Sequence, residues 1–549
     1  VKEEVKRLVQ EEEVEALAIC FLWSFRYPAH EQAAAAAIEE IYPDIFITKS
    51  SDIYPRIREY ERMNTAVLNC FVSRGADAYI GELSRRLTEA GLGQGRVTFM
   101  QSIGGQLSPD EGRREPIQLI HSGPVGGVIA ATHFAAEMGL SDVITADVGG
   151  TSFDTALIKG RRPTYAHRTK VNRLLTGLSS IDIHTIGAGG GSIAWIDERG
   201  VPQVGPRSAG SDPGPACYGK GGDEPTLTDV AVSLGLIDPL NFWGGALELD
   251  VGAARKAIGE RIAEPLGRSI EDAAAGLFEI AVNNMSTAMV TVSLARGYDP
   301  RDFTCLAYGG AAGLFMAEVC QRLGIRRVIL PPAAATFSAY GLLFSDAIRS
   351  YATTVEWLVD QGSLDEVNSA FEQLEEKAVS ALREQGFTEG DITVVREGDL
   401  KYAGQAFEVP MDMPSHPLTE EDRRLVHDHF VEMYERLYGA GTAWRGFPII
   451  LHTARVVATG ATRKPQLPRG NGARPRDAKA AQRGSREFVI GPGRKERAPV
   501  YDGPSMVTGM MLDGPAFVDD VDTTLLVPSG ARLAIDTWRN YVVDPGNAR

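Results

Sequence analysis

The sequence predicts an α/β fold in which helices cover a sheet, and three stretches carry this prediction. Residues 143–158 contain two apolar runs separated by a glycine pair, a pattern typical of a strand, a tight turn and a second strand. Residues 251–294 are mainly helical by their apolar spacing, and residues 304–332 read as strand, Gly-Gly turn, helix and strand. Such alternation indicates an α/β domain.

The first half of the chain supplies further elements of this kind. We expect alternating helix and strand over 1–58, a long helix over 58–90, a strand at 97–102 and a helix over 124–139 that begins at Pro124. Residues 184–225 are rich in glycine and proline and contain one short strand, at 192–196. Irregular stretches of this length in compact domains are usually functional.

After residue 350 the pattern changes. We expect an amphipathic helix over 364–385, two β segments around Gly404 within 392–413, a helix over 419–437 and an apolar strand over 449–457. Residues 464–495 are rich in Arg, Lys, Gly and Pro and lack periodicity, which predicts a linker. The last segment, 498–543, has short strands between Asp-Gly, Gly-Pro and Pro-Ser-Gly turns, which predicts a small β barrel or sandwich.

Composition excludes several classes of function. Among 549 residues, 44% are hydrophobic and 23% charged, as in an ordinary soluble globular protein. The net charge of −16 argues against a nucleic-acid backbone or an anionic membrane as partner. The five cysteines show no CxxC spacing, so the sequence indicates neither a zinc knuckle nor a disulfide framework. No apolar stretch reaches membrane-spanning length and no signal peptide precedes the first strand, so we expect a cytoplasmic protein.

The turn within residues 143–158 is the strongest candidate for a binding site. The pair Gly149-Gly150 lets a ligand approach the main chain closely, and Thr151 and Ser152 add hydroxyl donors beside the N–H groups of the turn. Asp147 stands at the mouth, where a carboxylate can hold a hydrated Mg²⁺ against phosphate oxygens. A plain hairpin is the alternative interpretation, but Thr151, Ser152 and Asp154 favour phosphate binding.

Two more glycine segments are candidate sites. One follows His184 and includes Gly189, Gly190 and Gly191, and the other is Tyr308-Gly309-Gly310-Ala311 before a helix. Glycines at a strand-to-helix turn let a flat ligand lie against the helix N-terminus. The alternatives are structural: a lone histidine is more often a satisfied structural residue than a catalyst, and Gly-Gly-Ala also suits a close helix–strand contact.

The segment from Asp147 to Asp154 resembles a phosphate loop of the actin, sugar-kinase and chaperone-ATPase superfamily. Within it, the chain resembles the hydantoinase A / 5-oxoprolinase family, which also contains acetone and acetophenone carboxylase subunits. Five further stretches carry this resemblance in the expected order along almost the whole chain: 57–62, 182–192, 208–219, 308–311 and 402–408.

The resemblance implies actin-like ATPase (ribonuclease-H-like) lobes, followed by a C-terminal α+β region and a small β barrel or sandwich. On this basis we expect the remainder of a first lobe at 1–58 and a second lobe, with the phosphate and adenosine loops, at 59–350. An α+β domain at 351–463, a linker at 464–497 and a β domain at 498–549 would follow.

The resemblance also implies a function. It is that of an A-type subunit of an ATP-dependent cyclic-amide hydrolase, which phosphorylates the amide carbonyl oxygen before water opens the ring. The expected cofactors are ATP and Mg²⁺ (or Mn²⁺), and the expected partners are a small cyclic amide and a B-type hydantoinase subunit in a hetero-oligomer. An ATP-dependent ketone carboxylase subunit and a non-catalytic scaffold subunit are the alternatives.

The expected roles fall on the residues already described. Asp147, Asp154 and His184 are the expected catalytic residues, and Asp147 is also the expected metal ligand. The expected cofactor-binding residues are those of the three glycine segments: Gly149, Gly150, Thr151, Ser152, Gly189, Gly190, Gly309, Gly310 and Ala311.

Members of this family usually open with a first Asp-x-Gly-Gly-Thr loop and a His-Gly-Thr stretch, and neither occurs in this sequence. We expect that the sequence is N-terminally incomplete, that the first lobe's phosphate loop lies on another polypeptide, or that it has been lost. A nucleotide held from one side only should be turned over slowly, since the transferring phosphate needs donors around all its oxygens.

Overall fold

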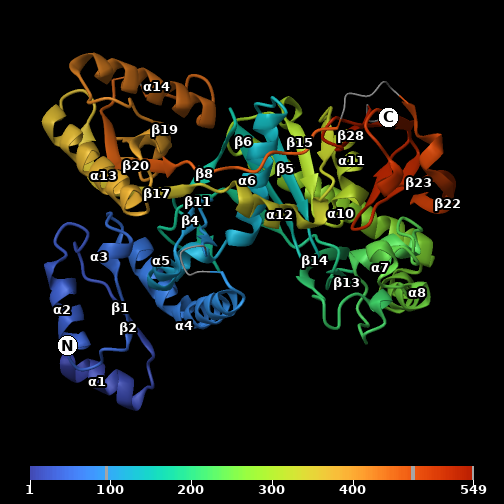
Figure 1. The fold of residues 1–549 in the computed structure, drawn as a ribbon, viewed down its shortest axis with the longest axis horizontal. Coiled ribbons are helices and arrows are strands. Elements are labelled where there is room, and N and C mark those ends of the chain that lie inside the picture. Colours follow the sequence, from blue (N-terminus) through green and yellow to red (C-terminus); the bar gives the residue numbers. More distant parts are fainter. Residues whose placement is uncertain (93–96, 445, 471–475, 492, 547–549) are drawn as a thin grey trace. The chain divides into compact units, whose positions relative to one another are not determined.

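The computed structural model describes residues 1–92, 97–444, 446–470, 476–491 and 493–546, which divide into two compact units (Figure 1). Unit 1 comprises Val1–Val125, Tyr165–Ile181 and Ser345–Lys464. Unit 2 comprises Gly126–Thr164, Asp182–Phe344 and Pro465–Arg549. Each unit is therefore built from three separate segments of the chain.

A mixed ten-stranded sheet forms the centre of unit 2, with strand order β12-β6-β5-β15-β16-β28-β27-β24-β21 and β7 beside β6 (Figure 1). Strand β5 runs antiparallel to β6 and parallel to β15, and β15 runs parallel to β16. The strands are β5 (Val143–Val148), β6 (Phe153–Lys159), β7 (Arg162–Pro163), β12 (Ile183–Ile186), β15 (Thr304–Tyr308), β16 (Val328–Leu330), β21 (Arg476–Asp477), β24 (Met510–Asp513), β27 (Arg532–Ile535) and β28 (Tyr541–Asp544).

Helices pack against this sheet, and their side chains contribute to the hydrophobic core of unit 2. The helices are α6 (Ser122–Glu137), α7 (Leu227–Ser233), α8 (Val251–Ile258), α9 (Glu264–Leu266), α10 (Ile270–Leu294), α11 (Ala312–Leu323) and α12 (Phe337–Tyr340). Helix α10 contacts β6 and β12, and α11 contacts β5 and β15. Nearly every residue of β5, β6 and β15 is buried, which explains why these strands read as continuous apolar runs. The α/β prediction is confirmed.

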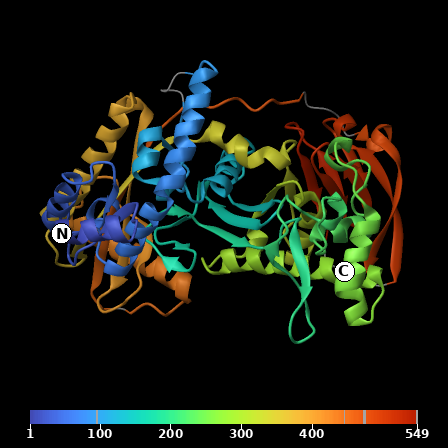
Figure 2. The same ribbon diagram turned by 90° about the horizontal axis from the view of Figure 1, so that it is seen from below.

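The glycine- and proline-rich stretch contains more regular structure than the sequence predicts. The expected strand is β13 (Ser192–Ile196), and it pairs antiparallel with β14 (Pro202–Ser208), which the sequence does not predict. Figures 1 and 2 show this hairpin extending away from the central sheet. Two prolines and a glycine within β14 conceal the strand pattern, because proline and glycine are rare in strand interiors.

The structure corrects the expectation for the C-terminal segment. Strands β28, β27 and β24 extend the central sheet, while β22 (Gln482–Gly491), β23 (Arg494–Asp502), β25 (Ala516–Asp519) and β26 (Thr524–Val527) form a separate four-stranded sheet. The strands of residues 498–543 do not form an independent barrel or sandwich. Some of them belong to the central sheet, which β28 joins by pairing with β16.

The prediction of a linker over 464–497 is also wrong in part, since β22 lies inside this range. The charged residues that hide this strand form ion pairs within its sheet: Arg486 of β22 contacts Asp519 of β25 at 2.6 Å, and Glu487 of β22 contacts Lys495 of β23 at 3.8 Å. Phe488 and Val489 supply its buried side chains. Residues 471–475 and 492 of the expected linker lie outside the described residues.

Unit 1 contains a four-stranded antiparallel sheet in the order β17-β20-β18-β19. Its strands are β17 (Ala347–Leu358), β18 (Ile392–Tyr402), β19 (Val409–Asp412) and β20 (Ile449–Gly460), and helices α13 (Leu364–Glu384) and α14 (Glu420–Tyr438) accompany them. Helices α13 and α14 and strands β18, β19 and β20 agree with the sequence prediction, whereas β17 was not predicted. Helix α13 packs on β17 and β20.

The N-terminal part of unit 1 has short strands and one long helix. Its elements are α1 (Lys2–Glu11), β1 (Ala16–Ile19), α2 (Ala29–Glu39), β2 (Phe46–Lys49), α3 (Ser50–Ile53), α4 (Glu59–Glu89), β3 (Phe99–Met100), β4 (Gln106–Leu107) and α5 (Pro109–Arg114). The short strands β8 (Tyr165–Ala166), β9 (Lys170–Val171), β10 (Leu174–Leu175) and β11 (Ser180–Ile181) also belong to unit 1.

A buried group of charges joins two strands of unit 1. The Arg455 side chain is 1% exposed and donates hydrogen bonds to Asp399 Oδ2 at 2.7 Å and to Glu397 Oε2 at 3.3 Å. Arg455 lies on β20 and the two carboxylates lie on β18. Burial opposes ionisation, but Arg455 and other cations hold the pKa of Asp399 down to about 2.

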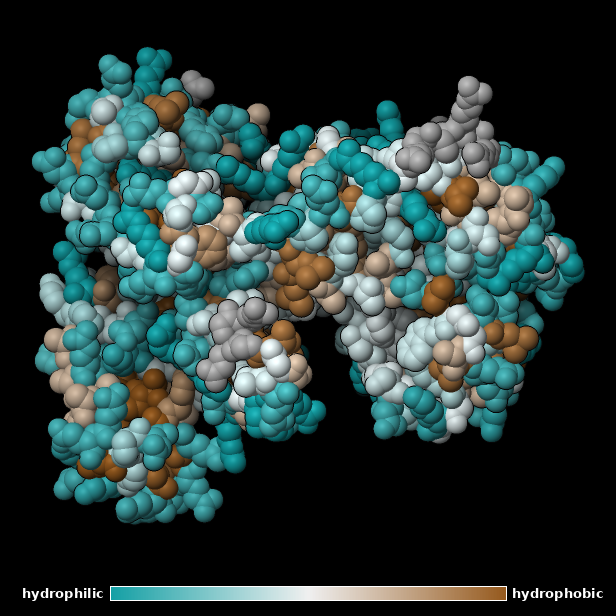
Figure 3. Space-filling view, viewed as in Figure 1, coloured by the Kyte–Doolittle hydropathy of each residue, from teal (hydrophilic) through white to brown (hydrophobic). Residues whose placement is uncertain are grey.

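The surface in Figure 3 is mostly hydrophilic, with separate small apolar patches. Within the described residues, no helix is both long enough and apolar enough to cross a membrane.

Candidate functional site

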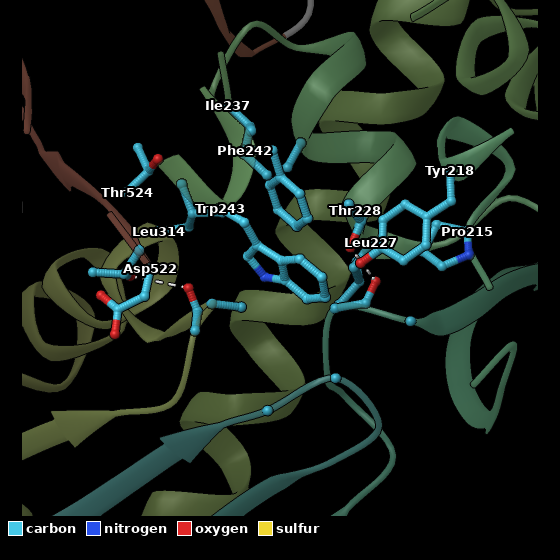
Figure 4. Close-up of a pocket in the computed structure, with 18 of the residues that line it drawn as sticks. Pro215, Tyr218, Leu227, Thr228, Ile237, Phe242, Trp243, Leu314, Asp522 and Thr524 are labelled. Carbon is cyan, nitrogen blue, oxygen red and sulfur yellow. Dashed lines mark hydrogen bonds between the residues drawn. The ribbon is translucent and has the colours of Figure 1, made fainter. Parts of the chain in front are cut away.

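A pocket of about 210 Å³ lies within unit 2, where segments far apart in the sequence meet. Its lining includes Gly149 and Gly150 from the turn after β5, and Gly310 and Ala311 from the turn before α11. Residues of the 190–243 stretch and of the loop between β25 and β26 complete the wall (Figure 4). Five of the predicted binding residues line it: Gly149, Gly150, Gly190, Gly310 and Ala311.

The first glycine segment is the predicted hairpin turn. The Gly149 N–H donates to the Ser152 carbonyl oxygen at 3.1 Å and closes the turn between β5 and β6. Gly150 and Thr151 are exposed, and within the described part of the chain their N–H groups have no protein acceptor. A Cβ atom added at Gly150 would meet nothing within 4 Å. This turn therefore presents free backbone donors beside open space, which suits an anionic ligand.

The second glycine segment supports the first. The Gly190 N–H donates to the Gly149 carbonyl oxygen at 2.9 Å, and the Gly191 N–H donates to the Gly150 carbonyl oxygen at 2.6 Å. A Cβ atom at Gly189 would lie 2.6 Å from Ser152 N and 2.7 Å from Gly149 O. Gly189 thus packs against the hairpin backbone and does not line the pocket, whereas Gly190 and Gly191 do.

The third glycine segment combines both of its predicted roles. Gly309 has a φ of +86°, and a Cβ there would lie 2.4 Å from the Val148 carbonyl oxygen, so it makes the close strand–helix contact. The Ala311 N–H donates to the same oxygen at 3.1 Å. Gly310 instead faces the pocket, and a Cβ there would meet Asp522 O at an ordinary 3.5 Å.

Four polar residues occupy one level across four neighbouring strands. Asp147 of β5 is paired in register with Asp154 of β6 and Tyr308 of β15, and Asp154 is paired with Thr185 of β12. Residues opposite one another in register lie on the same face of a sheet. The structure therefore brings the two predicted aspartates together at the carboxyl end of β5, beside the glycine turn.

The two aspartates have different environments. Asp154 is 7% exposed and accepts hydrogen bonds from Ser152 Oγ at 2.8 Å and from Thr185 Oγ1. Asp147 accepts one from Ser338 Oγ at 3.0 Å. Burial raises the pKa of Asp147 to about 6, and the nearby Asp154 charge adds to this rise, which the Ser338 hydrogen bond opposes. Among the described residues, no cation contributes to the pKa of Asp147.

His184 lies apart from these aspartates. On β12 it pairs in register with Thr155, the neighbour of Asp154. Because successive side chains along a strand point to opposite faces, the His184 Cβ faces away from the side that carries Asp147 and Asp154. His184 does not line the pocket, and Asp182 near it accepts a hydrogen bond from Arg296 Nε at 2.9 Å.

Three aromatic side chains form one wall, and sequence reasoning did not select them as ligand residues. The ring centroids of Tyr218 and Phe242 are 5.9 Å apart, and Phe242 stacks with Trp243 at 5.8 Å and 14°. Figure 4 shows the Trp243 indole extending into the middle of the pocket. An aromatic pair directly before Gly244-Gly245 was the available signal.

The loop between β25 and β26 forms the opposite wall and was also missed. Asp520 accepts a hydrogen bond from Tyr541 Oη, and Thr523 Oγ1 donates to the Gly310 carbonyl oxygen at 2.9 Å. Burial, followed by the Asp520 charge, raises the pKa of Asp522. No local pattern marks this loop, because long-range contacts bring it to the glycine segments: β26 packs on α11, the helix that follows Gly310 and Ala311.

Comparison with protein families assigns the chain. The Hydantoinase/oxoprolinase family matches residues 62–351, more than half of the chain, and the Hydantoinase/oxoprolinase C-terminal domain matches residues 359–543. The chain belongs to the hydantoinase/oxoprolinase family. The resemblance carried by the glycine-rich motifs is thereby confirmed.

Relatives of this hydantoinase/oxoprolinase family member include named enzyme subunits. The caprolactamase subunit alpha of Pseudomonas jessenii is 35% identical over 545 residues, covering 98% of this chain and 77% of that protein. The acetophenone carboxylase gamma subunit of Aromatoleum aromaticum is 33% identical, covering 97% and 74%. The crystal structure of the ATP-dependent caprolactamase from Pseudomonas jessenii superposes with a TM-score of 0.88 at 34% identity, covering 98% of this chain and 78% of that one.

The donor set at the turn bears on the metal that the family member is expected to use. Among the described residues, no group of three or more His, Cys, Asp or Glu is arranged to hold a metal ion. Magnesium is commonly bound by one or two carboxylates together with phosphate oxygens of a substrate. The Asp147 carboxylate lies beside the free turn amides and fits a site in which one carboxylate and phosphate oxygens of a substrate hold the magnesium ion.

Proposed function

We propose that this chain is the A-type subunit of an ATP-dependent hydrolase that opens small cyclic amides. The observation that carries the proposal is the pocket of unit 2. At one end it is lined by Gly150, whose free N–H lies next to that of Thr151 in the same turn, and another wall carries the stacked rings of Phe242 and Trp243. Donors for an anion and flat apolar surfaces for a base are what a nucleotide requires.

The protein's charge and packing support ATP as the ligand. The chain carries a net charge of −16, so its phosphate grip depends on backbone amides and a cation rather than on a basic surface. The expected adenosine turn at Gly310 and Ala311 borders the pocket, and Gly310 leaves room there for a ligand. The solved structure that superposes on this chain with a TM-score of 0.88 is that of an ATP-dependent caprolactamase.

Each residue of the site has a distinct task in this proposal. The Gly150 and Thr151 amides bind phosphate oxygens, and Gly189 and Gly190 keep that turn in place. Asp147 holds Mg²⁺ (or Mn²⁺), and Ser338 orients its carboxylate. Asp154, held by Ser152 and Thr185, positions the end of the turn. ATP supplies the phosphoryl group for the amide carbonyl oxygen, which makes the carbonyl carbon susceptible to water. His184 receives no role.

The proposed assembly is a hetero-oligomer with a B-type subunit. The relatives are named as subunits, alpha in the caprolactamase and gamma in the acetophenone carboxylase. We expect the B-type partner to handle the hydrolytic step, while this chain performs the ATP-dependent activation.

A substrate panel tests the proposal. The chain and its co-expressed B-type subunit are incubated with ATP, Mg²⁺ and either a lactam, a hydantoin, 5-oxoproline or a ketone with bicarbonate, and ADP is measured. Release stimulated by a cyclic amide, with ring-opened product in equal amount, supports the proposal. Release stimulated only by a ketone would replace it with the carboxylase function, which the acetophenone carboxylase relative favours. If the chain binds no nucleotide, the enzymatic proposal fails and a non-catalytic scaffold subunit is the remaining alternative.

A further inference from the structure

We propose that Trp243 binds the base of the nucleotide by stacking on it, and that a strained backbone presents its ring for this purpose. This inference rests on the proposed function. It assigns the base-binding surface to a residue outside the three glycine segments.

The backbone at Trp243 is the first observation. Trp243 has φ +51° and ψ +47° and is followed by two left-handed glycines, Gly244 at +60° and Gly245 at +88°. Glycine adopts such angles without strain, but a bulky side chain does so only where the surrounding structure imposes it. Strained residues of this kind cluster at ligand clamps and other functional sites.

The exposure of the ring is the second observation. Trp243 is 62% exposed although it lines a pocket. Its strained conformation therefore does not serve core packing, because most of the side chain has no protein cover. In Figure 4 the indole extends into the open space between Asp522 on one side and Tyr218 on the other.

The third observation is that the ring is braced from behind. Phe242 stacks on Trp243 at a centroid distance of 5.8 Å, and Tyr218 packs against Phe242 at 5.9 Å. A Cβ atom at Gly244 would lie 3.3 Å from Val521 Cγ1, so the turn also rests on the loop between β25 and β26. A ring held in this way is a preorganised platform, and stacking on such platforms is tolerant of base identity because every base has a π face.

The test uses the full chain and two probes, ADP and inorganic tripolyphosphate, in equilibrium titrations with Mg²⁺. Both probes present phosphates to the turn, but only ADP carries a base. Trp243→Gly removes the ring and relieves the left-handed strain, Trp243→Phe keeps a smaller ring, and Trp195→Phe is the control. Trp195 lies on β13 of the same unit, donates to the Gly205 carbonyl oxygen at 2.6 Å and does not line the pocket.

We expect Trp243→Gly to weaken ADP binding by about ten-fold or more, with tripolyphosphate binding unchanged and the melting temperature no lower than that of the unsubstituted protein. Trp243→Phe should retain most of the affinity, and the control should match the unsubstituted protein. ADP binding by Trp243→Gly within two-fold of the original would overturn the inference. An equal loss for both probes would also overturn it, since the ring would then act on the fold. If the unsubstituted chain binds no ADP, the proposed function itself fails.

Discussion

The backbone N–H of Gly190 donates to the carbonyl oxygen of Gly149 at 2.9 Å and joins the two glycine loops into one layered structure. The upper layer, at Gly150 and Thr151, presents free amides. The lower layer, at Gly189, fills the space beneath the turn. Glycines that look equivalent in the sequence therefore have separable tasks, which substitution can distinguish.

Alanine at Gly189 and at Gly150 should have opposite consequences. A Cβ at Gly189 collides with backbone atoms at 2.6 and 2.7 Å, so Gly189→Ala should lower the free energy of unfolding by about 1–3 kcal/mol. Gly150→Ala meets no atom within 4 Å, so its stability should change by less than about 0.5 kcal/mol while ADP affinity falls. Thermal unfolding and ADP titration check both variants. Equal stability losses would contradict the layered arrangement.

Valine at Gly310 should weaken nucleotide binding without unfolding the protein. The nearest atom to an added Cβ is 3.5 Å away, so the valine side chain fills pocket space rather than displacing backbone. We expect ADP affinity to fall by about ten-fold, a loss comparable to removing one good ligand contact. Gly309→Ala is the contrasting variant, because its +86° backbone and a 2.4 Å contact predict a loss of stability instead. Unchanged ADP affinity in folded Gly310→Val would show that the nucleotide does not occupy the pocket space beside Gly310.

Substitution of Asp147 should separate activity from stability. Asp147→Ala and Asp147→Asn should both abolish ATP turnover, measured as ADP release with Mg²⁺, because each removes the carboxylate proposed to hold the metal. The fold should persist, since no cation of the described part of the chain contributes to the Asp147 pKa and would be left unpaired. Turnover at the original rate by either variant would contradict the assignment of Asp147.

The same carboxylate should make stability depend on pH without divalent metal. Because the folded-state pKa of Asp147 is about 6, above its ordinary 3.8, the folded protein binds more protons than the unfolded chain between these values. Stability contributed by this group is therefore complete below pH 4 and is lost as the pH rises through 6. Asp147→Asn should gain up to about 3 kcal/mol over the unsubstituted protein at pH 7 and nothing near pH 3. A difference independent of pH would contradict this.

The buried charges of unit 1 should behave in the opposite sense. Asp399→Ala leaves the 1%-exposed Arg455 without its closest carboxylate and should cost about 3–5 kcal/mol of unfolding free energy. Since the pKa of Asp399 is held near 2, its contribution is present above pH 4 and is lost as the pH falls through 2. Glu82→Ala, which breaks only exposed ion pairs with Arg85 and Arg86, is the control and should cost less than about 1 kcal/mol.

Local patterns predicted the parts of the fold and site that local chemistry determines. The hairpin at Gly149-Gly150, the turn at Gly309–Ala311, helices α4, α13 and α14 and strands β18, β19 and β20 follow from spacing and glycine placement within short segments. Prediction from the sequence failed where contacts between distant segments determine the position of a residue or the presence of a strand. Asp520 to Thr523 reach the pocket through long-range packing of β26 on α11, and β22 is a strand because it pairs antiparallel with β23.

The site residues show the same division. His184 was chosen for its chemistry, but the two-residue period of β12 directs it away from the aspartates. Trp243 was not chosen because its strained backbone angle and its exposure inside a pocket are visible only in three dimensions. Residue type alone carries neither kind of information.

The transfer of oxygen from amide to phosphate tests the central claim most directly. A cyclic amide substrate labelled with ¹⁸O in its carbonyl group is turned over by the chain with its B-type subunit, ATP and Mg²⁺, and the released phosphate is analysed by mass. If the carbonyl oxygen accepts the phosphoryl group, this oxygen leaves with it, so each phosphate should gain one ¹⁸O atom per amide opened. Unlabelled phosphate accompanying ring opening would contradict the account, because ATP would then not act on the carbonyl.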